Sequence, residues 1–389
     1  MIAQVRRDTP ADPVIASLIS YTATGSEITG GAALGDDEAA RLAAIGEAVE
    51  RHCANQVPAD LRRAAYRELT EPAVHPGSFA LYSPAQYRAR GFPFVPMTPD
   101  LEITWAPAED LTSGEKVLVP ASLVYVNYFA GPRRSEPPTN YPVLAGTAAG
   151  PTLEGARQAA LREVLERDAV TVWWHGGSPA SPLPKPVKGP LATALGEAAD
   201  AGLTVSLLRI PTPFDAIVAG AFVEDRARRV VGFGSACRAT EEEAAAKAFT
   251  EAIGTYETGR VLLRRDVGQR PYLRRRADRR YLDDLPRGWR DVNDVRLHVQ
   301  VYLDERLQDG GLDRLRLPSG PELSETPRSL TEQGFRAYAV DLTMPDTGLH
   351  VARVLVPGLY CDAPAAFPFL GGARLPASPD LARQPLPFA

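Results

Sequence analysis

Cysteine is scarce in this 389-residue sequence: Cys53, Cys237 and Cys361 lie far apart and form no CxxC pair. An odd number of scattered cysteines argues against a disulfide framework, and no zinc-knuckle spacing is present. No apolar run is long enough for a signal peptide or a membrane span. We therefore expect a cytoplasmic protein that does not insert into a membrane.

Lysine is almost as rare, because Lys116, Lys185, Lys188 and Lys247 are the only lysines among 43 basic residues. The net charge of -5 argues against nucleic-acid binding through bulk basicity. No Gly-Lys-Ser/Thr sequence occurs, which excludes a Walker-type phosphate loop. The hydrophobic share of 44% is typical of a folded globular protein, and the length favours two or three packed sub-domains.

Three segments share one pattern: a Gly-rich or small-residue approach, a helix start rich in acids and hydroxyls, and an Ala-rich helix that carries glutamates. They cover residues 24–54, 145–170 and 232–260. The expected helix starts are marked by Asp36 and Asp37, by Thr152 and Glu154, and by Thr240–Glu243. The pattern predicts three related helical units.

Short runs rich in β-branched residues separate and follow these units. They cover residues 101–111, 116–126, 203–210, 215–225, 228–238, 335–343 and 350–359. Strands and helices do not alternate strictly, so the order favours an α+β fold with mixed sheets over a doubly wound parallel sheet. We divide the chain into 1–60 with the first helix, 61–270 with the other two, and 271–389 with a strand pair and a Pro-rich tail.

Two of the helices carry the same ExxER motif, in GEAVER and REVLERDA. The motif residues are Glu47, Glu50 and Arg51 on the first helix and Glu163, Glu166 and Arg167 on the second. Residues three or four apart share a helix face, so each helix presents two carboxylates that repel one another unless a cation lies between them. Mg²⁺ is the hard, oxygen-seeking cation for such a site. If the two helices face each other, they enclose a cavity suited to Mg²⁺ ions that carry a triphosphate.

The third helix adds Lys247 and Glu251, again four residues apart. A single ExxER is usually a solvated ion pair on a helix surface. Two near-copies among Ala, Val and Leu favour a functional site, although the motif alone leaves the ligand open. A structural protein with packed ion pairs remains the alternative at this point.

The motif segments resemble the YcaO family. The resemblance is carried by LAAIGEAVER, AAGPTLEGARQAALREVLERDAV, SACRATEEEAAAKAFTEA and DLTMPDTGLHVARVLVPGL, and it spans most of the chain from about residue 24. It implies an ATP site without a P-loop, surrounded by the three Glu-bearing helical units. It further implies Mg²⁺ ligands and nucleotide-binding residues on the matching positions: Glu47, Glu50, Glu163 and Glu166 for the metal, and Arg51, Arg167, Lys247 and Glu251 for ATP.

The sequence departs from the family pattern at several positions. Pro151 stands where the family often has Asn, and Gly155 where it often has Glu. Glu154 is adjacent and could bind the nucleotide if the helix start shifts. Ala43 replaces a common Ser, the first Gly-rich approach lacks a Lys, and QPLPFA is a degenerate form of a Pro-x-Pro-x-Pro tail.

The resemblance implies ATP-dependent activation of backbone amides in a ribosomally made precursor peptide, with thiazoline or oxazoline formation as the expected product. Amidine rings, thioamides, or a degenerate subunit that binds a peptide or partner without turnover are the alternatives. We recognise no leader-peptide-binding module, so a separate partner protein is expected, and the family implies a homodimer. The nine arginines of 260–280 form either a basic face for an acidic leader or, as we favour, a solvated surface.

Overall fold

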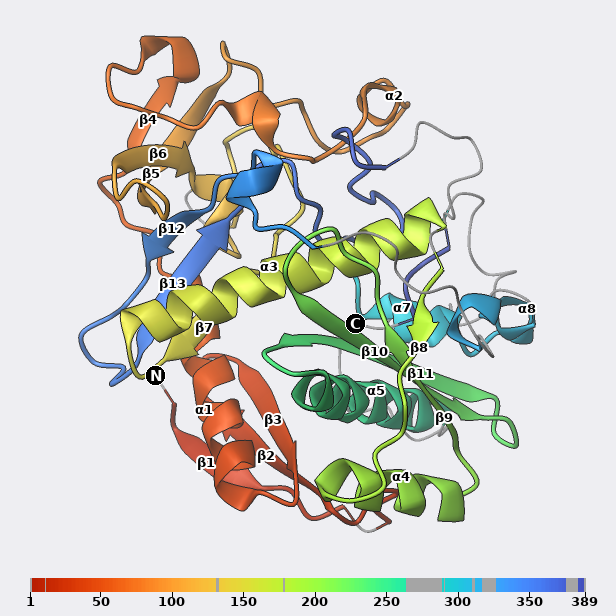
Figure 1. The fold of residues 1–389 in the computed structure, drawn as a ribbon. Coiled ribbons are helices and arrows are strands. Elements are labelled where there is room, and N and C mark those ends of the chain that lie inside the picture. The colour runs from red at the N-terminus through yellow and green to blue at the C-terminus, as the bar shows by residue number, and fades with distance from the viewer. Residues whose placement is uncertain are drawn as a thin grey trace.

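The computed structural model describes residues 2–10, 12–130, 133–177, 179–263, 289, 291–309, 312–316, 327–375 and 384–387. Within this part of the chain the named strands form three sheets, and every pairing between them is antiparallel. The helices pack on and between the sheets (Figure 1). The α+β fold that the sequence predicts is confirmed, whereas the sheets formed by the named strands are antiparallel rather than mixed.

The sheets differ in size. The three-stranded sheet contains β1 (Gln4–Arg7), β2 (Leu18–Thr24) and β3 (Ile28–Leu34) in that order. The four-stranded sheet has the order β11 (Val230–Arg238), β10 (Ile217–Asp225), β9 (Thr204–Arg209) and β8 (Ser181–Pro182). The six-stranded sheet has the order β4 (Arg62–Ala65), β5 (Glu102–Asp110), β12 (Tyr338–Asp341), β13 (His350–Leu355) and β7 (Thr147–Gly150), while β6 (Lys116–Pro120) also pairs with β5.

Three long helices carry the predicted motifs, and shorter ones lie around them. The long helices are α1 (Asp37–Ala54), α3 (Leu153–Gly176) and α5 (Glu241–Leu263). The others are α2 (Pro84–Tyr87), α4 (Pro190–Asp200), α7 (Leu297–Val301) and α8 (Glu305–Gln308). Short 3-10 helices cover Tyr66–Glu68, Pro76–Ser78, Ala121–Leu123, Asp313–Leu315 and Thr331–Gln333. In the part of the chain described above, no helix is both long and apolar enough to cross a bilayer.

The predicted helix starts are confirmed by their caps. Asp36 accepts a hydrogen bond from the Ala39 backbone N–H at 2.9 Å at the start of α1. Thr152 caps α3 through the Gly155 N–H at 3.1 Å, and Thr240 accepts from the Glu243 N–H at 3.2 Å at the start of α5. Each cap satisfies a backbone donor that the helix itself leaves unpaired.

Each long helix directly follows a strand and packs on it, so that β3–α1, β7–α3 and β11–α5 form three strand–helix units. Each helix also touches the strand of another unit: α1 contacts β7, α3 contacts β11, and α5 contacts β3. The three units therefore close into a ring of helix-to-strand contacts. The helix α3 crosses the middle of the molecule, between the six-stranded and four-stranded sheets (Figure 1).

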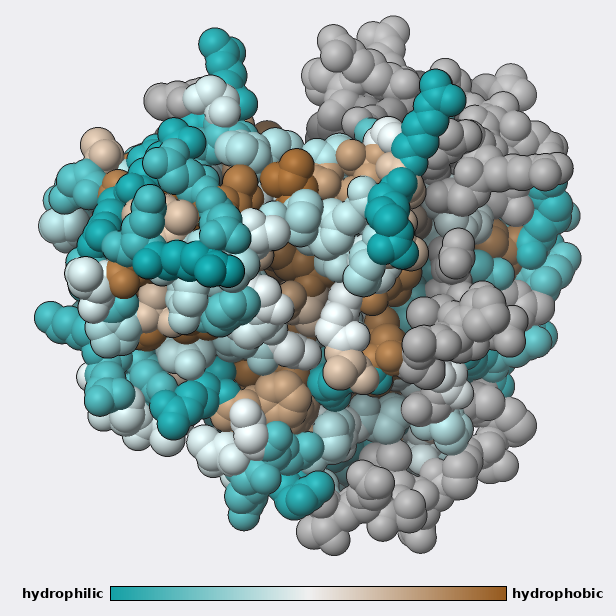
Figure 2. Space-filling model, turned by 90° about the horizontal axis from the view of Figure 1, so that it is seen from above, coloured by the Kyte–Doolittle hydropathy of each residue, from teal (hydrophilic) through white to brown (hydrophobic). Residues whose placement is uncertain are grey.

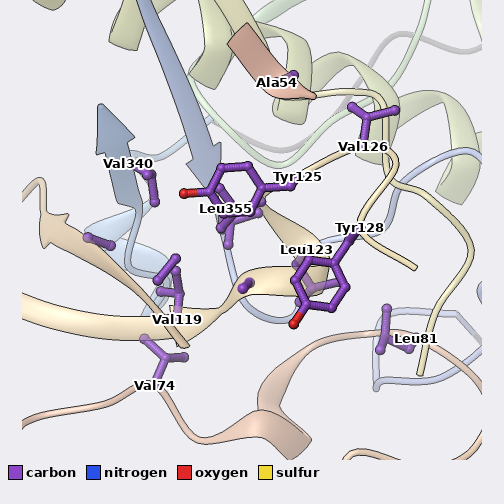
Figure 3. Packing of buried hydrophobic residues seen from close by; sticks show 14 of the residues in the cluster. Ala54, Val74, Leu81, Val119, Leu123, Tyr125, Val126, Tyr128, Val340 and Leu355 are labelled. Carbon is purple, nitrogen blue, oxygen red and sulfur yellow. The ribbon is translucent and has the colours of Figure 1, made fainter. Parts of the chain in front are cut away.

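The largest hydrophobic cluster lies against the six-stranded sheet. It joins residues of β5, β6, β12 and β13 to the end of α1 and to the segment that follows β6, where Leu123, Tyr125 and Tyr128 are buried (Figure 3). A second cluster lies between α5, α4 and the four-stranded sheet. Seen from above, hydrophobic residues also gather in the middle of the face, with hydrophilic residues beside them on the side of the six-stranded sheet (Figure 2).

The structure differs from the sequence-based expectation in a few elements. The strand expected over 116–126 ends at Pro120, where a 3-10 helix begins. Strands β1 to β3 and helix α4 were not predicted. The β3 sequence ITGGAAL has few β-branched residues, and its small side chains serve the close approach of α1 rather than strand propensity.

Glycines permit the close packing of strand on helix. A Cβ atom at Gly234 in β11 would lie 2.4 Å from the Ala248 carbonyl oxygen and 2.5 Å from the Ala252 nitrogen of α5. Both atoms belong to the helix backbone, so the strand and helix would have to separate. A Cβ atom added at Gly254 on α5, by contrast, would have no heavy atom within 4 Å.

We expect Gly234→Ala to lower the free energy of unfolding by about 2 kcal/mol, because overpacking forces backbone shifts. The matched control Gly254→Ala should raise it by about 0.5 kcal/mol or more, because Ala is the better helix former. Urea denaturation of both variants measures the difference. Equal effects of the two substitutions would contradict this account of the β11–α5 contact.

Candidate functional site

A cleft opens where α1, α3, β7 and the segment after β13 meet. It encloses about 610 Å³ of space between the protein atoms, open solvent at its mouth included. Its charged lining residues are Glu47, Glu50, Arg51, Glu163, Arg167 and Asp362. The two ExxER helices therefore face one cavity, and five of their six motif residues line it.

The backbone of the segment 146–149 orients two of these carboxylates. The Ala149 N–H on β7 donates to Oε1 of Glu50 at 2.7 Å, and the Gly146 N–H donates to Oε2 of Glu163 at 2.8 Å. Among the described residues, no hydrogen bond involves the second oxygen of either carboxylate. Each glutamate is thus held by one oxygen and has the other available to a ligand.

The two arginines are held by neighbouring acids. The Arg51 Nε donates to Glu47 Oε1 at 2.9 Å, one helical turn away on α1. Burial alone would lower the pKa of Arg167, but the charges of Glu166, Asp362 and Glu163 raise it above its ordinary value. Both guanidinium groups are therefore cationic throughout the physiological range.

Carboxylates outnumber guanidinium groups in the cleft, and their pKa values reflect this. Burial raises the pKa of Glu163 to about 7, and the charges of Glu166 and then Glu47 add to this shift, against the lowering effect of Arg167. Burial, and then the charge of Glu47, also raises the pKa of Glu50 well above its usual range. Carboxylate oxygens are the ligands that hard divalent cations prefer. Among the described residues, however, no group of three or more His, Cys, Asp or Glu side chains is already arranged to hold a metal ion.

Glu166 faces β11 rather than the lining of the cleft. Its side chain is 5% exposed, its Oε1 accepts from the Ser235 hydroxyl at 2.8 Å, and its Oε2 accepts from the Cys237 N–H at 3.0 Å. Glu50 and Glu166 occupy the same position relative to their N-caps. Each accepts a backbone N–H from a strand of another unit, so the second glutamate of the motif has the same structural role twice.

The third helix carries a related but incomplete set. Glu251 stands at the same distance from its N-cap Thr240 as Glu47 and Glu163 stand from theirs, while Gly254 replaces the second glutamate. Lys247 and Glu251 form a partly exposed ion pair outside the lining of the cleft. Burial alone would raise the pKa of Glu251, but Lys247 and then Arg167 lower it below its ordinary value.

Other residues singled out in the sequence lie elsewhere. Glu154 is exposed in the first turn of α3, where its Oε1 accepts from Gln158 at 2.9 Å, and it does not line the cleft. Cys237 is buried at 2% exposure. Of the arginine-rich stretch 260–280, residues 264–280 lie outside the described residues, as do 376–383 and 388–389 of the Pro-rich tail.

Sequence reasoning missed Asp362, which lines the cleft beside Arg167. It also missed Asp168, a buried acid that pairs with Arg374 and accepts from the Tyr360 N–H at 2.9 Å. This pair fastens the segment that carries Asp362 onto α3. The available signal was a charged pair, Arg167 and Asp168, followed by a long apolar run on one helix, because buried charges need partners from elsewhere in the chain.

Comparisons with known proteins agree with this architecture. A family model described as "YcaO cyclodehydratase, ATP- and Mg2+-binding" matches residues 33–360. An uncharacterized protein of Methanothermobacter thermautotrophicus is 29% identical over 337 residues, which are 82% of this chain and 78% of that protein.

Solved structures show the same fold at low identity. A heterocyclase in complex with substrate and cofactor has a TM-score of 0.67 at 20% identity, over 92% of this chain and 50% of that chain. The E. coli microcin synthetase McbBCD complex has a TM-score of 0.72 at 12% identity, over 99% of this chain and 96% of that chain. YcaO from Methanopyrus kandleri bound with AMPPCP and Mg²⁺ has a TM-score of 0.54 at 22% identity, over 92% of this chain and 86% of that chain. The chain spans about half the length of the two heterocyclase chains that it matches, 50% and 47%.

The raised pKa of Glu163 predicts how Mg²⁺ affects stability. Its folded-state pKa of about 7 lies above the ordinary value of 4.5, so without metal its contribution to stability is lost as pH rises from the ordinary value through about 7. Mg²⁺ binds the deprotonated carboxylate, so we expect the Mg²⁺-induced rise in Tm to be larger above pH 7 than below it. Thermal unfolding with and without Mg²⁺ measures this, and Glu163→Gln should lose most of the pH dependence. A rise in Tm that is independent of pH would contradict the assignment.

Proposed function

Because the chain belongs to the YcaO family, we propose that it uses ATP and Mg²⁺ to activate backbone amides of a ribosomally made precursor peptide and to close thiazoline or oxazoline rings. The observation that carries the proposal is the shared cleft, where the carboxylates of both ExxER helices meet two arginines. The donor chemistry supports a metal site, because Glu50 and Glu163 each retain a carboxylate oxygen for a cation. Binding would require the cleft side chains to rearrange around the ion.

The proposed cation ligands are the four motif glutamates, with Asp362 added by the structure. Glu47, Glu50 and Glu163 line the cleft with Asp362. Glu166 stays in the set because it is the counterpart of Glu50, and each of its oxygens keeps a lone pair besides the one used by Ser235 or Cys237. Its buried side chain would serve a cation on the side of β11 and α5.

The proposed nucleotide-binding residues are positively charged groups around this acidic centre. Arg51 and Arg167 would contact phosphate oxygens, since planar guanidinium groups suit bidentate contacts with phosphate. Lys247 and Glu251 on α5 would act at the edge of the site, where the charge of Arg167 helps to lower the pKa of Glu251. For Glu154, which lies in the first turn of α3, contact with ATP requires a shift of the helix start.

ATP, when bound, supplies the phosphoryl group that converts the substrate amide oxygen into a leaving group. The side chain of a Cys, Ser or Thr in the peptide attacks the preceding carbonyl carbon, and the former carbonyl oxygen leaves with the phosphate. The contribution of the protein is to position the groups and to neutralise charge, as in other phosphoryl transfers. Arg51 and Arg167 are the residues placed to neutralise charge.

We expect Glu50→Gln, Glu163→Gln and Glu166→Gln to abolish peptide-dependent phosphate release, because an amide is a much weaker cation ligand than a carboxylate. The matched control is Glu38→Gln on the exposed face of α1, where Glu38 pairs with Arg41 at 2.7 Å. Phosphate release should be measured with Mg²⁺, and circular dichroism should show that each variant is folded. Wild-type turnover in a folded Glu50→Gln variant would defeat the site assignment.

The product distinguishes the possible ring chemistries. The proposed substrate is a precursor peptide rich in Cys, Ser and Thr, which should be sought among the genes beside this one. We expect the loss of one water for each ring and protection of the modified Cys thiol from alkylation. In a peptide where Cys is the only residue able to form an azoline, loss of water with the thiol still reactive would indicate an amidine. Exchange of oxygen for sulfur with a sulfide donor would indicate a thioamide. Mass spectrometry before and after alkylation makes the distinction.

Partners belong to the proposal as well. We propose that a separate leader-peptide-binding protein delivers the peptide, so the assays should include any such protein encoded nearby. A homodimer is proposed from family membership and can be tested by light scattering. Nucleotide binding without any peptide-dependent phosphate release, with the partner present, would favour a degenerate binding subunit.

A further inference from the structure

Arg353 is a buried arginine whose partners are almost all backbone carbonyls. It lies on β13, it is 0% exposed, and no ion pair joins it to an acid among the described residues. Burial lowers its pKa to about 10, so it is still cationic at neutral pH. A buried cation without a paired carboxylate is costly, and its hydrogen bonds must offset that cost.

Four hydrogen bonds join Arg353 to two chain segments. Its Nη1 donates to the Leu144 carbonyl oxygen at 3.0 Å and to the Thr147 hydroxyl at 2.8 Å. Its Nη2 donates to the carbonyl oxygens of Val143 and Leu123, each at 2.9 Å. Three of the four acceptors lie within 143–147, the segment that enters β7.

The backbone beside Arg353 holds the same segment. The Val354 N–H donates to the Gly146 carbonyl oxygen at 2.8 Å, and Arg353 lies opposite Thr147 in the β13–β7 register. Gly146 has a φ of +89°, and a Cβ there would lie 2.7 Å from the Val354 carbonyl oxygen. The turn at Gly146 thus packs directly against β13, with no room for a side chain at this position.

This segment presents the amides that orient the cleft carboxylates. The Gly146 N–H binds Glu163 at 2.8 Å, and the Ala149 N–H, two residues beyond Thr147, binds Glu50 at 2.7 Å. We propose that Arg353 is a positioning residue that fixes segment 143–147, so that these two amides hold Glu50 and Glu163 in the geometry for cation binding. The inference rests on the proposed cation site and names the part of the chain that preorganises it.

The test is cation affinity, measured apart from turnover. The probe is Mn²⁺ alone, followed by electron paramagnetic resonance on the full chain. Arg353→Lys keeps the charge but loses the planar fork, and Thr147→Val removes one acceptor with little change in shape. We expect both to weaken Mn²⁺ binding by about 10- to 100-fold, the usual effect of removing support behind a metal ligand.

The control is Val205→Ala on β9, a buried position in the four-stranded sheet and in a different hydrophobic cluster. It should lower Tm through a cavity while Mn²⁺ affinity stays within about twofold. Wild-type affinity in Arg353→Lys or Thr147→Val, or an equal loss in Val205→Ala, would overturn the inference. If Arg353→Lys does not fold, Thr147→Val decides.

Amide hydrogen exchange provides a readout that needs no cation. We expect the amides of Gly146 and Ala149 to exchange faster in Arg353→Lys and Thr147→Val than in wild type, and to be unchanged in Val205→Ala. Unchanged exchange in the first two variants would also overturn the inference. Failure of wild type to bind Mn²⁺ would instead refute the proposed cation site, while the exchange data would still show whether Arg353 orders the segment.

Discussion

The site depends on a hydrogen bond that is made twice, from a strand amide of one unit to a buried glutamate on the helix of another. Ala149 donates to Glu50, and Cys237 donates to Glu166. Each bond joins a helix to a strand that is far away in sequence. Because a buried carboxylate without such a donor is strongly destabilising, the bond couples the packing of the units to the placement of the acids.

The electrostatics follow from that packing. Helices α1 and α3 bring Glu50 and Glu163 together and bury them. Burial is the main cause of their raised pKa values, and the excess of carboxylates over Arg51 and Arg167 adds to it. In a low-dielectric cleft such an excess favours a divalent cation more strongly than it would in water. The protein thus concentrates negative charge where the proposed reaction has to neutralise phosphate.

Local features were predictable from the sequence. The caps at Asp36, Thr152 and Thr240 are short-range interactions, so helix starts and their shared register could be inferred directly. The spacing of the ExxER motif predicted one carboxylate face on each of two helices. The prediction that these faces meet was a step beyond spacing, and the shared cleft agrees with it.

Non-local features were not predictable in the same way. Asp362 and Arg353 lie some two hundred residues after the start of α3 in the sequence. Their positions beside the cleft depend on how β13 pairs with β7. No local pattern distinguishes Arg353 from the many exposed arginines. The separate orientation of Glu166 also depends on β11, since a motif shows which helix face a side chain shares but not which strand covers that face.

The ring of helix-to-strand contacts has a consequence for how this architecture can be divided. A break between β7–α3 and the rest of the chain would leave Glu50 without the Ala149 amide, and removal of β11–α5 would leave Glu166 without Cys237. An excised β3–α1 or β7–α3 unit would therefore contain a buried carboxylate without its hydrogen-bond donor. The units resemble one another, yet each depends on contacts with the others, and none is expected to fold on its own.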